Sequence, residues 1–481
     1  VRDININYCA GKIRVATLGR GIWESDLYPQ TLVAPRTQNS ATWSSNRKEI
    51  QSFTIPNGQT LTINNGAVIN MAANTFIKIQ TGGKLVIDNA TIKNDCGYMW
   101  SGIQVLGTGS SQTQTPNSKQ GVLVMKNGAK IENAYVAAMA DQATYTAPDY
   151  TYPNGSATGN SQTDKTGGII QVQFNQSKPD TISNCRKGIG FGYYHSPPVS
   201  GSEPANKSYI YGCVFQNTGT LNLPYVNAYT SEFISMWQVH GVGLAGNKFY
   251  GPTGINQSAA PLTAVVSTDA DYTIGDYCIS GDLPCTNVQH TEFHDLFRGV
   301  KSTITDPTEA ARLLKVSNCI FSNVRRSVYL AGHKNATLTF NTINLNQATV
   351  DTAYGIYTNA CTFYTIEENT ITGVGTSWPN HYGMIINNSV GPNNVNDDNL
   401  VYKNTFNDLK YGAVSMRRNA DCATGCTHGL EFRCNTFNNV KFSIAVFPEN
   451  PSGSGQPTIK QSQGSSTDPV GNYFNISTTQ Y

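Results

Sequence analysis

One short sequence pattern returns along the chain and constrains its fold more than any other feature. The segments KNTFNDLKYGAVSM (403–416) and CNTFNNVKFSIAVF (434–447) both contain Asn-Thr-Phe, two polar residues, an aliphatic residue, a lysine and an alternating apolar run. Looser copies are SNCIFSNVRRSVYL (317–330) and SNCRKGIGF (183–191). A repeat of this kind buries its apolar residues only by stacking on its neighbours, so the sequence predicts a solenoid.

Each copy of the repeat carries one large apolar residue at a matching position, which we call its anchor. The anchors are Phe215, Phe249, Phe293, Phe321, Ile343, Ile371, Phe406, Phe437 and Phe474. Their spacing is irregular, because 22 residues separate Phe321 from Ile343 and 31 separate Phe406 from Phe437. Apolar residues alternate after the anchors, which is the periodicity of a strand and not of a helix. The sequence therefore predicts one coil of short strands per repeat, with loops of varied length.

An asparagine lies two positions before five of the anchors. These residues are Asn247, Asn341, Asn369, Asn404 and Asn435. One asparagine per coil at a fixed turn allows the amide side chains to stack and hydrogen-bond from coil to coil, as in cross-β ladders. The whole pattern resembles the right-handed parallel β-helix of pectin-lyase-like proteins, over residues 50–481. An all-β antiparallel sandwich is the alternative, but the repeat region lacks the paired hairpin turns that a sandwich needs.

Loops and one short helix complete the expected solenoid. Long insertions are expected at 141–167, 193–208, 252–288, 388–399 and 448–469. Loops of this kind often form the binding face of a solenoid. The segment TDPTEAARLLK (305–315) has a capping Asp or Thr, Pro307 in the first turn and an apolar pair, which predicts a short helix.

The first 49 residues differ from the repeat region. Residues 1–28 predict two strands joined at Ala10-Gly11, and residues 29–49 predict a linker without periodicity. The run ATLGRGIW (16–23) resembles the closing strand of sortilin-like BNR β-propellers, which implies a remnant or adapter of a propeller that precedes Val1. The phrases GGKLVIDNATI (82–92) and WSGIQV (100–105) resemble the opening coils of cell-surface cargo of the Bacteroidota type IX secretion system. These resemblances imply one part of a longer, processed, multidomain protein.

The composition indicates where the protein is located and which classes of partner are not expected. Of the 481 residues, 39% are hydrophobic and only 13% are charged, a balance that is typical of extracellular β proteins. The formal net charge of +2 gives no reason to expect a nucleic acid or a membrane surface as partner. No apolar run reaches the length of a membrane span. We therefore expect a secreted or cell-surface protein.

Eleven cysteines raise the question of disulfides or metal. Two groups of neighbouring cysteines predict one or two local loop disulfides: Cys278 with Cys285, and a cluster of Cys422, Cys426 and Cys434. A zinc site is the alternative for the second group, formed by Cys422, Cys426, His428 and Cys434, although their spacing matches no common zinc finger. Cys213 and Cys319 lie at or beside the turn position that asparagine holds elsewhere, and we expect them to be buried free thiols.

Carboxylates are the first candidates for catalysis, because proteins resembling this one include polysaccharide lyases and glycoside hydrolases. Asp397-Asp398 lies among asparagines and predicts a solvated loop. His240-Gly241 and Gly332-His333 are each half of the Gly-His-Gly motif of polygalacturonases. The acidic loop containing Asp269, Asp271 and Asp276 offers oxygen ligands for Ca²⁺, with Arg298, Lys301 and Arg325 as nearby bases for a lyase. An exposed acidic loop without a cation is the alternative.

Basic residues recur four positions after the anchors. They are Arg186, Arg325, Lys410 and Lys441, with Arg298 displaced by one position. On stacked coils such bases would form partial rows, and arginine in particular suits the carboxylates of an anionic polysaccharide. The alternative is a solvent-facing turn at which any long polar residue serves.

Taken together, these patterns predict a module for carbohydrate binding, adhesion or structural display more than an enzyme. The expected partners are a polysaccharide or cell-surface glycan and neighbouring domains of the same chain. No cofactor is expected, and Ca²⁺ is the one ion with candidate ligands. The alternative function is a polysaccharide lyase or glycoside hydrolase acting on an acidic, uronate-containing polysaccharide. Convergence of the Asp269–Asp276 loop with Arg298, Lys301 and Arg325 on one cleft would favour the enzyme.

Overall fold

The structure is a computed structural model of the chain. It describes residues 2–7, 12–26, 34–107, 114, 119–141, 167–194, 206–254, 257–258, 260–282, 284–309, 312–345, 352–375, 379–389, 399–420, 426–447, 459–467 and 469–475. Two compact units are present, Val1–Gly243 (unit 1) and Leu244–Tyr481 (unit 2), and each is described by itself. No helix in the described ranges is long and apolar enough to cross a membrane.

The N-terminal segment of unit 1 forms a three-stranded antiparallel sheet of β1 (Asp3–Asn7), β2 (Lys12–Thr17) and β3 (Gly21–Asp26). The expectation of two strands in residues 1–28 is therefore wrong. The run ATLGRGIW does not continue one strand, because Gly19 and Gly21 take φ values of +83° and +78° and turn the chain between β2 and β3.

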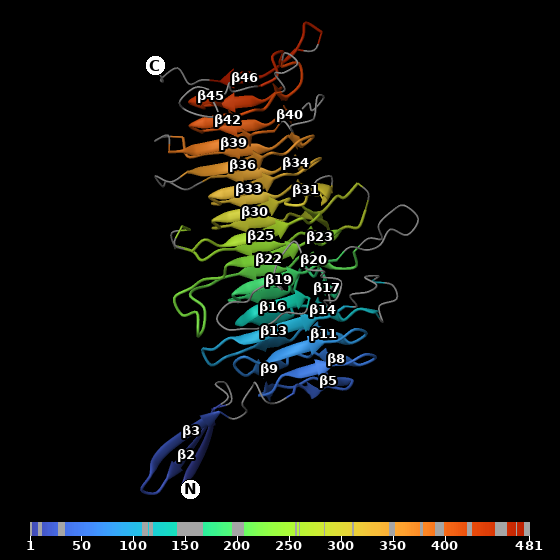
Figure 1. The fold of residues 1–481 in the computed structure, drawn as a ribbon, viewed down its shortest axis with the longest axis vertical. Helices are drawn as coiled ribbons and strands as arrows, with labels where there is room; N and C mark the ends of the chain where they lie inside the picture. The colour runs from blue at the N-terminus through green and yellow to red at the C-terminus, as the bar shows by residue number, and fades with distance from the viewer. Residues whose placement is uncertain are drawn as a thin grey trace. The chain divides into compact units, whose positions relative to one another are not determined.

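The remaining strands of unit 1 wind into a right-handed parallel β-helix in which three parallel sheets line the coil (Figure 1). Sheet 1 contains β4 (Arg36–Thr37), β7 (Phe53–Ile55), β10 (Phe76–Ile79), β13 (Trp100–Val105), β16 (Ala134–Ala140), β19 (Lys187–Phe191) and β22 (Glu232–Trp237). Sheet 2 contains β5 (Ala41–Trp43), β8 (Thr60–Ile63), β11 (Lys84–Asp88), β14 (Val122–Lys126), β17 (Ile169–Val172) and β20 (Tyr209–Tyr211). Sheet 3 contains β6 (Arg47–Glu49), β9 (Val68–Met71), β12 (Thr91–Lys93), β15 (Lys130–Glu132), β18 (Thr181–Ser183) and β21 (Val214–Gln216).

The first coil begins earlier than expected. Strands β4, β5 and β6 lie within 29–49, the segment predicted to be a linker, and they pair in parallel with β7, β8 and β9. The linker prediction is wrong for these strands. Their inward positions include Arg36 and Glu49, so the apolar alternation that marks later strands is absent from this coil.

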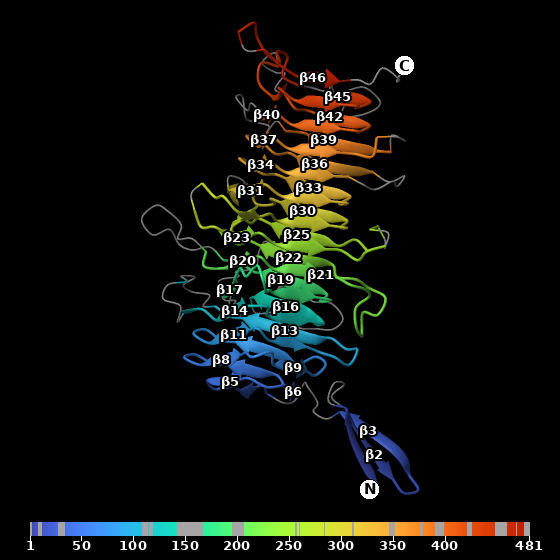
Figure 2. The ribbon, with the colours of Figure 1, turned by 180° about the vertical axis from the view of Figure 1, so that it is seen from behind.

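Unit 2 repeats the same three-sided coil (Figure 2). Its sheet 1 contains β25 (Thr263–Thr268), β30 (Arg298–Thr303), β33 (Arg326–Ala331), β36 (Ala353–Asn359), β39 (His381–Asn387), β42 (Tyr411–Met416) and β45 (Phe442–Phe447). Its sheet 2 contains β26 (Tyr272–Gly275), β31 (Leu314–Ser317), β34 (Thr337–Thr339), β37 (Thr365–Glu367), β40 (Asn399–Tyr402) and β43 (Leu430–Arg433). Its sheet 3 contains β24 (Lys248–Tyr250), β29 (Glu292–His294), β32 (Ile320–Ser322), β35 (Thr342–Asn344), β38 (Thr370–Thr372), β41 (Thr405–Asn407), β44 (Thr436–Asn438) and β46 (Tyr473–Asn475). Strand β23 (Val242–Ala245) spans the division between the units, and β27 (Tyr277–Cys278) and β28 (Val288–Gln289) form an antiparallel hairpin.

The predicted anchors lie in register along sheet 3. In unit 2 each anchor pairs with the next, from Phe249 through to Phe474. Where successive anchors are aromatic their rings stack, with centroids 4.4 Å apart for Phe293 and Phe321 and 4.9 Å apart for Phe406 and Phe437. The prediction of one coil per repeat is confirmed.

Four of the five predicted asparagines form a ladder in unit 2, whereas the backbone N–H of Asn247 donates to Thr291 Oγ1 on the next coil over 3.3 Å. The Nδ2 atoms of Asn341, Asn369, Asn404 and Asn435 each donate to Oδ1 of the asparagine on the next coil, over 2.8 to 3.2 Å. The last acceptor is Asn472, which extends the ladder one coil beyond the predicted set. The same Oδ1 atoms also accept a backbone N–H, so each amide joins two coils twice.

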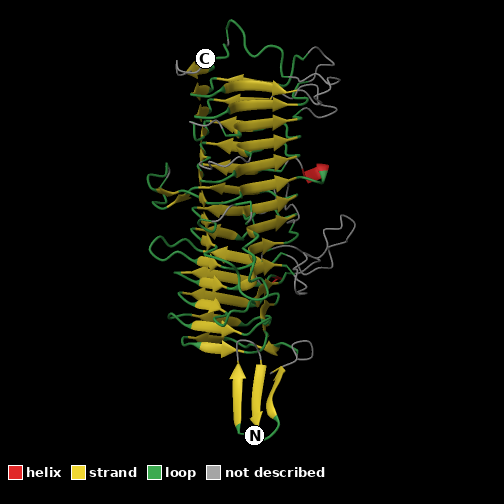
Figure 3. Ribbon diagram, turned by 90° about the vertical axis from the view of Figure 1, so that its left-hand side faces the viewer, coloured by secondary structure: helices red, strands yellow, loops and turns green. Residues whose placement is uncertain are grey.

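The predicted helix at 305–315 is reduced to a single 3₁₀ turn, η3 (Pro307–Glu309), drawn in red in Figure 3. Leu314 and Lys315 belong instead to β31. Leu314 is fully buried and lies in register with Tyr272 on the neighbouring coil. Pairing with that coil therefore overrides the local helical signal.

Candidate functional site

The outer face of sheet 1 in unit 2 carries a row of large side chains. Because its strands are parallel and in register, residues at one position stack from coil to coil. This outer row consists of Arg298, Arg326, Tyr354, Tyr382, Tyr411 and Phe442. It thus begins with two cations and continues with four aromatic rings.

The last three rings of the outer row, Tyr382, Tyr411 and Phe442, lie nearly parallel to one another. The centroids of Tyr382 and Tyr411 are 4.7 Å apart with 6° between the ring planes, and those of Tyr411 and Phe442 are 5.1 Å apart at 19°. Exposure rises along the row, from 7% for Tyr354 to 44% for Phe442. Because the rings cover one another's faces, solvent reaches mainly the ring edges, and it reaches most of Phe442 at the end of the row.

A second row runs beside the first on the same face. It contains Lys301, Tyr329, Tyr357, Ile385, Val414 and Ala445. Tyr357 joins the rows, since its ring centroid lies 5.3 Å from that of Tyr329 and 5.4 Å from that of Tyr354. The aromatic surface is defined here as Tyr329, Tyr354, Tyr357, Tyr382, Tyr411 and Phe442.

Three arginines gather around one ring at the start of the aromatic surface. The guanidinium carbons of Arg298, Arg325 and Arg326 lie 4.9, 5.3 and 4.9 Å from the ring centroid of Phe297. These three residues are called the arginine cluster. Burial lowers the pKa of Arg298, and the neighbouring Arg326 acts in the same direction, whereas Tyr354 raises it.

The members of the arginine cluster have different surroundings. Arg325 is 8% exposed, and it donates to Ser258 Oγ and to the carbonyl of Thr352. Arg298 and Arg326 form no ion pair with an acidic side chain in the described ranges. Two guanidinium charges therefore lie beside the aromatic surface without a carboxylate from the described part of this chain.

The tyrosines of the surface are suited to packing and not to proton transfer. Burial raises the pKa of Tyr354 to about 12, although Arg326 and Arg298 oppose the shift. Burial also raises the pKa of Tyr357 and of Tyr382. Their hydroxyls are therefore protonated at neutral pH and can donate hydrogen bonds.

The predicted row of bases four positions after the anchors is only partly assembled. Lys410 donates to Oδ1 of Asn380 over 2.7 Å, and its Nζ lies 5.5 Å from the ring of Tyr411. Lys441 lies similarly beside the last ring of the outer row. Ala353 and His381 occupy this position on the intervening coils, so the row is interrupted.

Two other predicted bases lie elsewhere. Arg298 is in register with Arg326 and not with Arg325, which explains its displacement by one position in the repeat. Arg186 belongs to unit 1, where it donates to the carbonyl of Tyr229 over 2.7 Å and stacks on Tyr225. There it holds a loop and does not contribute to the aromatic surface.

The acidic candidates do not form a cation site. Asp269 is 2% exposed, and its carboxylate accepts from Thr305 N and Oγ1 and from Asp306 N over 2.5 to 2.9 Å. Asp276 lies beyond the other end of β26 and pairs with His290, Oδ1 to Nδ1, at 2.7 Å. Burial raises the pKa of Asp276. Asp271 is half-buried just before β26.

Asp269 also lies far from Arg298, the first of the candidate bases. Asp269 comes directly after the last residue of β25. Arg298 is in register with Thr263, the first residue of the same strand. Six residues of strand separate the two positions, which is about 20 Å. Lys301 lies midway along β30, in the second row of the outer face. Asp269 and Arg298 therefore lie at opposite ends of the strands of sheet 1. The pair Asp397-Asp398 lies outside the described residues.

The half-motif Gly332-His333 is also structural. His333 Nε2 lies 2.8 Å from Ser302 Oγ, which accepts a hydrogen bond from Ser267 over 2.6 Å. His333 and Ser302 are 1% and 0% exposed, so no substrate reaches them. Burial lowers the pKa of His333 to about 4, and the ring is therefore neutral.

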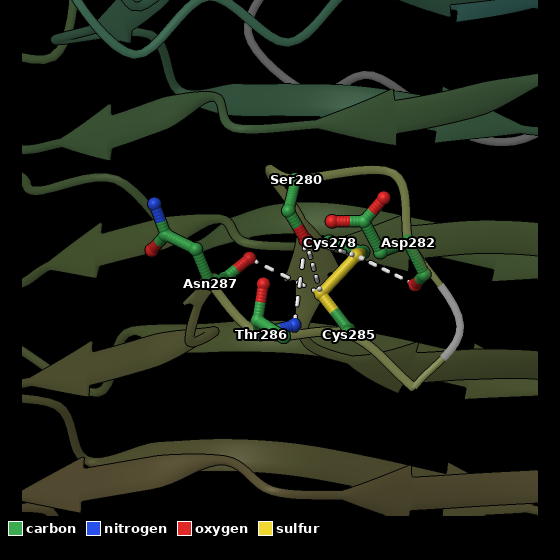
Figure 4. Close-up of a disulfide and its surroundings, with 6 residues drawn as sticks. All are labelled: Cys278, Ser280, Asp282, Cys285, Thr286 and Asn287. Atoms are coloured by element: carbon green, nitrogen blue, oxygen red, sulfur yellow. Dashed lines mark hydrogen bonds between the residues drawn. A yellow bond between two sulfur atoms is a disulfide. The ribbon is translucent and has the colours of Figure 1, made fainter.

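The cysteines confirm one predicted disulfide, Cys278–Cys285 (Figure 4). It closes the β27–β28 hairpin, in which Thr286 N–H also donates to Ser280 Oγ over 3.3 Å. The predicted thiols Cys213 and Cys319 are buried and form no disulfide, and burial raises the pKa of both.

The second cysteine group gives a mixed result. Cys426 is disulfide-bonded, Cys434 is free, and Cys422 lies outside the described residues. The prediction of a disulfide at Cys434 is therefore wrong. The zinc alternative with His428 is also wrong, because the sulfur of Cys426 is already in a disulfide and is not a thiolate ligand. Across the described ranges, no group of three or more His, Cys, Asp or Glu side chains could hold a metal ion.

Comparison with known proteins gives two partial likenesses. Residues 287–475 match the family model described as "Periplasmic copper-binding protein (NosD)". The crystal structure of a point mutant of the periplasmic alginate epimerase AlgG is similar at 9% identity with a TM-score of 0.35, over 84% of this chain and 76% of that one. No curated protein matches the sequence. In the described part of the matched region, no group of three or more His, Cys, Asp or Glu side chains could hold a metal ion.

Sequence reasoning missed most of this site. The missed residues are Phe297, Arg326, Tyr329, Tyr354, Tyr357, Tyr382, Tyr411 and Phe442. A signal existed for four members of the outer row: Arg298, Arg326, Tyr411 and Phe442 each lie five positions after an anchor. Tyr354 and Tyr382 each lie eleven positions after theirs, because loops intervene.

Proposed function

We propose that this protein is a carbohydrate-binding β-helix module that acts outside the cytoplasm and holds an acidic polysaccharide on the outer face of sheet 1 in unit 2. The observation that carries the proposal is the aromatic surface with the arginine cluster at its start. The stacked rings offer a row of exposed apolar edges to sugar rings, and the guanidinium groups offer forked donors to carboxylates or sulfates.

The dimensions of the surface suit an extended chain. Successive coils lie about 4.8 Å apart, so an aromatic or basic side chain recurs at that interval along the outer row. A polymer lying across the coils would meet several rings in turn. Individually weak contacts then add along its length, because one bound sugar holds the next close to its own ring.

Further support concerns location and assembly. The disulfide Cys278–Cys285 favours an oxidising compartment. The partly matching family is described as periplasmic, which agrees with a place outside the cytoplasm. Within this proposal the module belongs to a longer surface protein of the type IX cargo class and contributes binding or adhesion, with no resident cofactor and no Ca²⁺.

Binding to immobilised polysaccharides tests the proposal. The full chain is measured against neutral, uronate-containing and sulfated polymers, with and without Ca²⁺. Replacing both Tyr382 and Tyr411 by alanine should weaken binding about tenfold or more, because two ring contacts of about 1 kcal/mol each are lost. Tyr209→Ala is the matched control, since its ring also stacks on a tyrosine, at 4.5 Å, but on sheet 2 of unit 1.

Three results would contradict the proposal. Retention on no polymer would leave the module without a carbohydrate ligand. Equal loss of binding in the double variant and in the Tyr209→Ala control would remove the aromatic surface as the site. New reducing ends or unsaturated ends in the incubated polymers would show the alternative, a hydrolase or a lyase.

A further inference from the structure

Charge is distributed unevenly along the outer face of sheet 1 in unit 2. Strands β30 and β33 carry Arg298 and Arg326 in the outer row and Lys301 in the second row, and these three residues are called the first basic group. The next two strands, β36 and β39, contain no lysine, arginine, aspartate or glutamate. Lys410 and Lys441, beside the rings of Tyr411 and Phe442, form the second basic group. Two basic groups thus flank an uncharged middle.

The uncharged middle presents rings and one aliphatic side chain. Tyr354 and Tyr382 occupy the outer row, with Tyr357 and Ile385 beside them in the second row. Tyr354 and Ile385 are buried, whereas Tyr357 and Tyr382 are half-buried. A carboxylate held on these side chains would lose water without meeting a cation, which is unfavourable even where a tyrosine hydroxyl donates to it. The middle therefore favours a neutral sugar over an acidic one.

Other titratable groups near the middle do not supply this cation. His381, at the start of β39, is fully buried and does not face a ligand. Burial raises the pKa of Tyr357, and the charge of Arg417 opposes this shift. Arg417 comes directly after β42, whereas Lys410 comes directly before it. Arg417 therefore belongs to the coil of the second basic group and adds to its charge.

The side chains of both basic groups keep donors for a ligand. Lys410 donates to the neutral amide of Asn380 over 2.7 Å, which leaves two further hydrogens on its ammonium group. Lys441 is exposed, with Nζ 5.7 Å from the ring centroid of Phe442. Like the arginines of the outer row, neither lysine forms an ion pair with an acidic side chain in the described ranges. An anionic ligand group can therefore bind at either end without displacing a carboxylate of the described chain.

Given the proposed function, on which this step rests, we propose that the ligand is a polysaccharide whose acidic sugars are separated by neutral ones. One acidic group meets Arg298 and Arg326, neutral sugars cross β36 and β39, and the next acidic group meets the second basic group. From Arg326 to Tyr411 the outer row rises by three coils. At about 4.8 Å per coil this is about 14 Å, and a pyranose in an extended chain is about as long as one coil rise, so the acidic groups are roughly three sugars apart.

The expected preference is a difference between affinities, and both parts of the face contribute to it. A polymer of uronate alone satisfies the basic groups but places carboxylates on Tyr354 and Tyr382. A neutral polymer suits the middle and leaves the basic groups without an anionic partner. A polymer of intermediate charge density satisfies both parts, and its affinity is therefore the highest.

Carboxyl reduction of polygalacturonate provides the test, because it converts acidic sugars to neutral ones on the same backbone. Binding of the full chain is measured across a series from fully charged to fully reduced polymer, at constant ionic strength. We expect the highest affinity at intermediate charge, at least about threefold above either end of the series. The series uses the parent chain, so it decides the question even where a variant fails to fold.

Two variants of one residue test the part played by the middle. Tyr382→Arg places a cation there and should move the highest affinity to the fully charged polymer. Tyr382→Gln is the matched control, since it removes the same ring without adding charge, and it should weaken binding with the maximum unchanged. A maximum that Tyr382→Arg leaves in place, or that both variants move alike, would overturn the assignment.

The parent series separates this inference from the proposed function. Affinity that rises steadily with charge would overturn the inference and leave the proposed binding of an acidic polysaccharide standing. Affinity that falls steadily with charge would overturn the inference together with the preference for acidic glycans. Binding to no member of the series or of the neutral and sulfated polymers would contradict the proposed function itself.

Discussion

Asn369 donates a hydrogen bond from Nδ2 to Oδ1 of Asn404 on the next coil, over 2.9 Å. The same Oδ1 accepts the backbone N–H of Asn369 over 3.0 Å, so one amide satisfies two donors of its neighbour. Asn404 in turn donates to the carbonyl of Ile366 and to Asn435. Each ladder residue therefore satisfies buried backbone groups at a turn where the strand ladder is interrupted.

Asn404→Ala should be strongly destabilising. The substitution leaves the N–H and Nδ2 of Asn369 and the carbonyl of Ile366 with a lost partner inside the coil. Buried groups of this kind cost about 1–3 kcal/mol each, so we expect a loss of about 3–5 kcal/mol in the free energy of unfolding. Denaturant unfolding measures it. Asn407→Ala is the control, since Asn407 faces outward on the same coil, and its cost should stay below about 1 kcal/mol.

The anchor rings predict a difference between the interior and the end of unit 2. Phe437 is 1% exposed and stacks between Phe406 and Phe474, so Phe437→Ala should cost about 3–5 kcal/mol. Phe474 stacks on one ring only and is 49% exposed, so Phe474→Ala should cost about 1–2 kcal/mol. Thermal and denaturant unfolding of both variants give the comparison. Equal losses would show that the last coil is as well packed as the interior.

Much of the fold could be predicted from the sequence because its cause is local and repeated. An Asn at the turn, an anchor two residues later and an alternating run recur on most coils of unit 2, and parallel stacking turns that spacing into register. The first coil was missed for the same reason. Its inward positions hold Arg36 and Glu49, so it carries no apolar alternation to detect.

The candidate site was harder to predict because it depends on register across loops. Arg298 and Arg326 keep a constant distance from their anchors, but six extra residues displace Tyr354 and Tyr382. In sequence these tyrosines look unrelated to Tyr411. Strand pairing alone places all three in one row. The acidic loop failed as a site for the opposite reason: neighbours in sequence, Asp269 and Asp276, lie beyond opposite ends of β26.

The buried carboxyl of Asp180 predicts a pH dependence of stability in unit 1. Burial raises its pKa from 3.8 to about 7, although Oδ1 accepts the N–H groups of Gly128 and Ala129 over 3.0 and 2.8 Å. Because the pKa is higher in the folded than in the unfolded chain, its contribution is complete below about pH 4 and is lost as the pH rises through 7. The loss is at most about 4 kcal/mol.

Asp180→Asn keeps the shape of the side chain and removes the titration. The variant should therefore show a smaller fall in unfolding free energy between pH 4 and pH 8 than the parent chain. Other groups titrate identically in both proteins, so the difference between the two curves isolates Asp180. Parallel curves over that range would mean that this carboxyl is already ionised in the folded state.

The arginine cluster predicts how binding depends on charge. Replacing Arg298 and Arg326 together by glutamine should weaken binding of a uronate polymer about tenfold or more at low salt, since charge-assisted hydrogen bonds contribute about 1.5–3 kcal/mol each. Binding of a neutral polymer should change little, because the stacked rings remain. The parent chain should also lose affinity for the uronate polymer as salt rises, and the double variant should lose less. Lys403→Gln is the control, as Lys403 is exposed at the turn between β40 and β41 and pairs with Glu368 at 3.7 Å. If the double variant binds both polymers as the parent chain does, the arginines are not the source of a preference for acidic glycans. The contact of sugars with Tyr382 and Tyr411 is tested separately by the tyrosine variants.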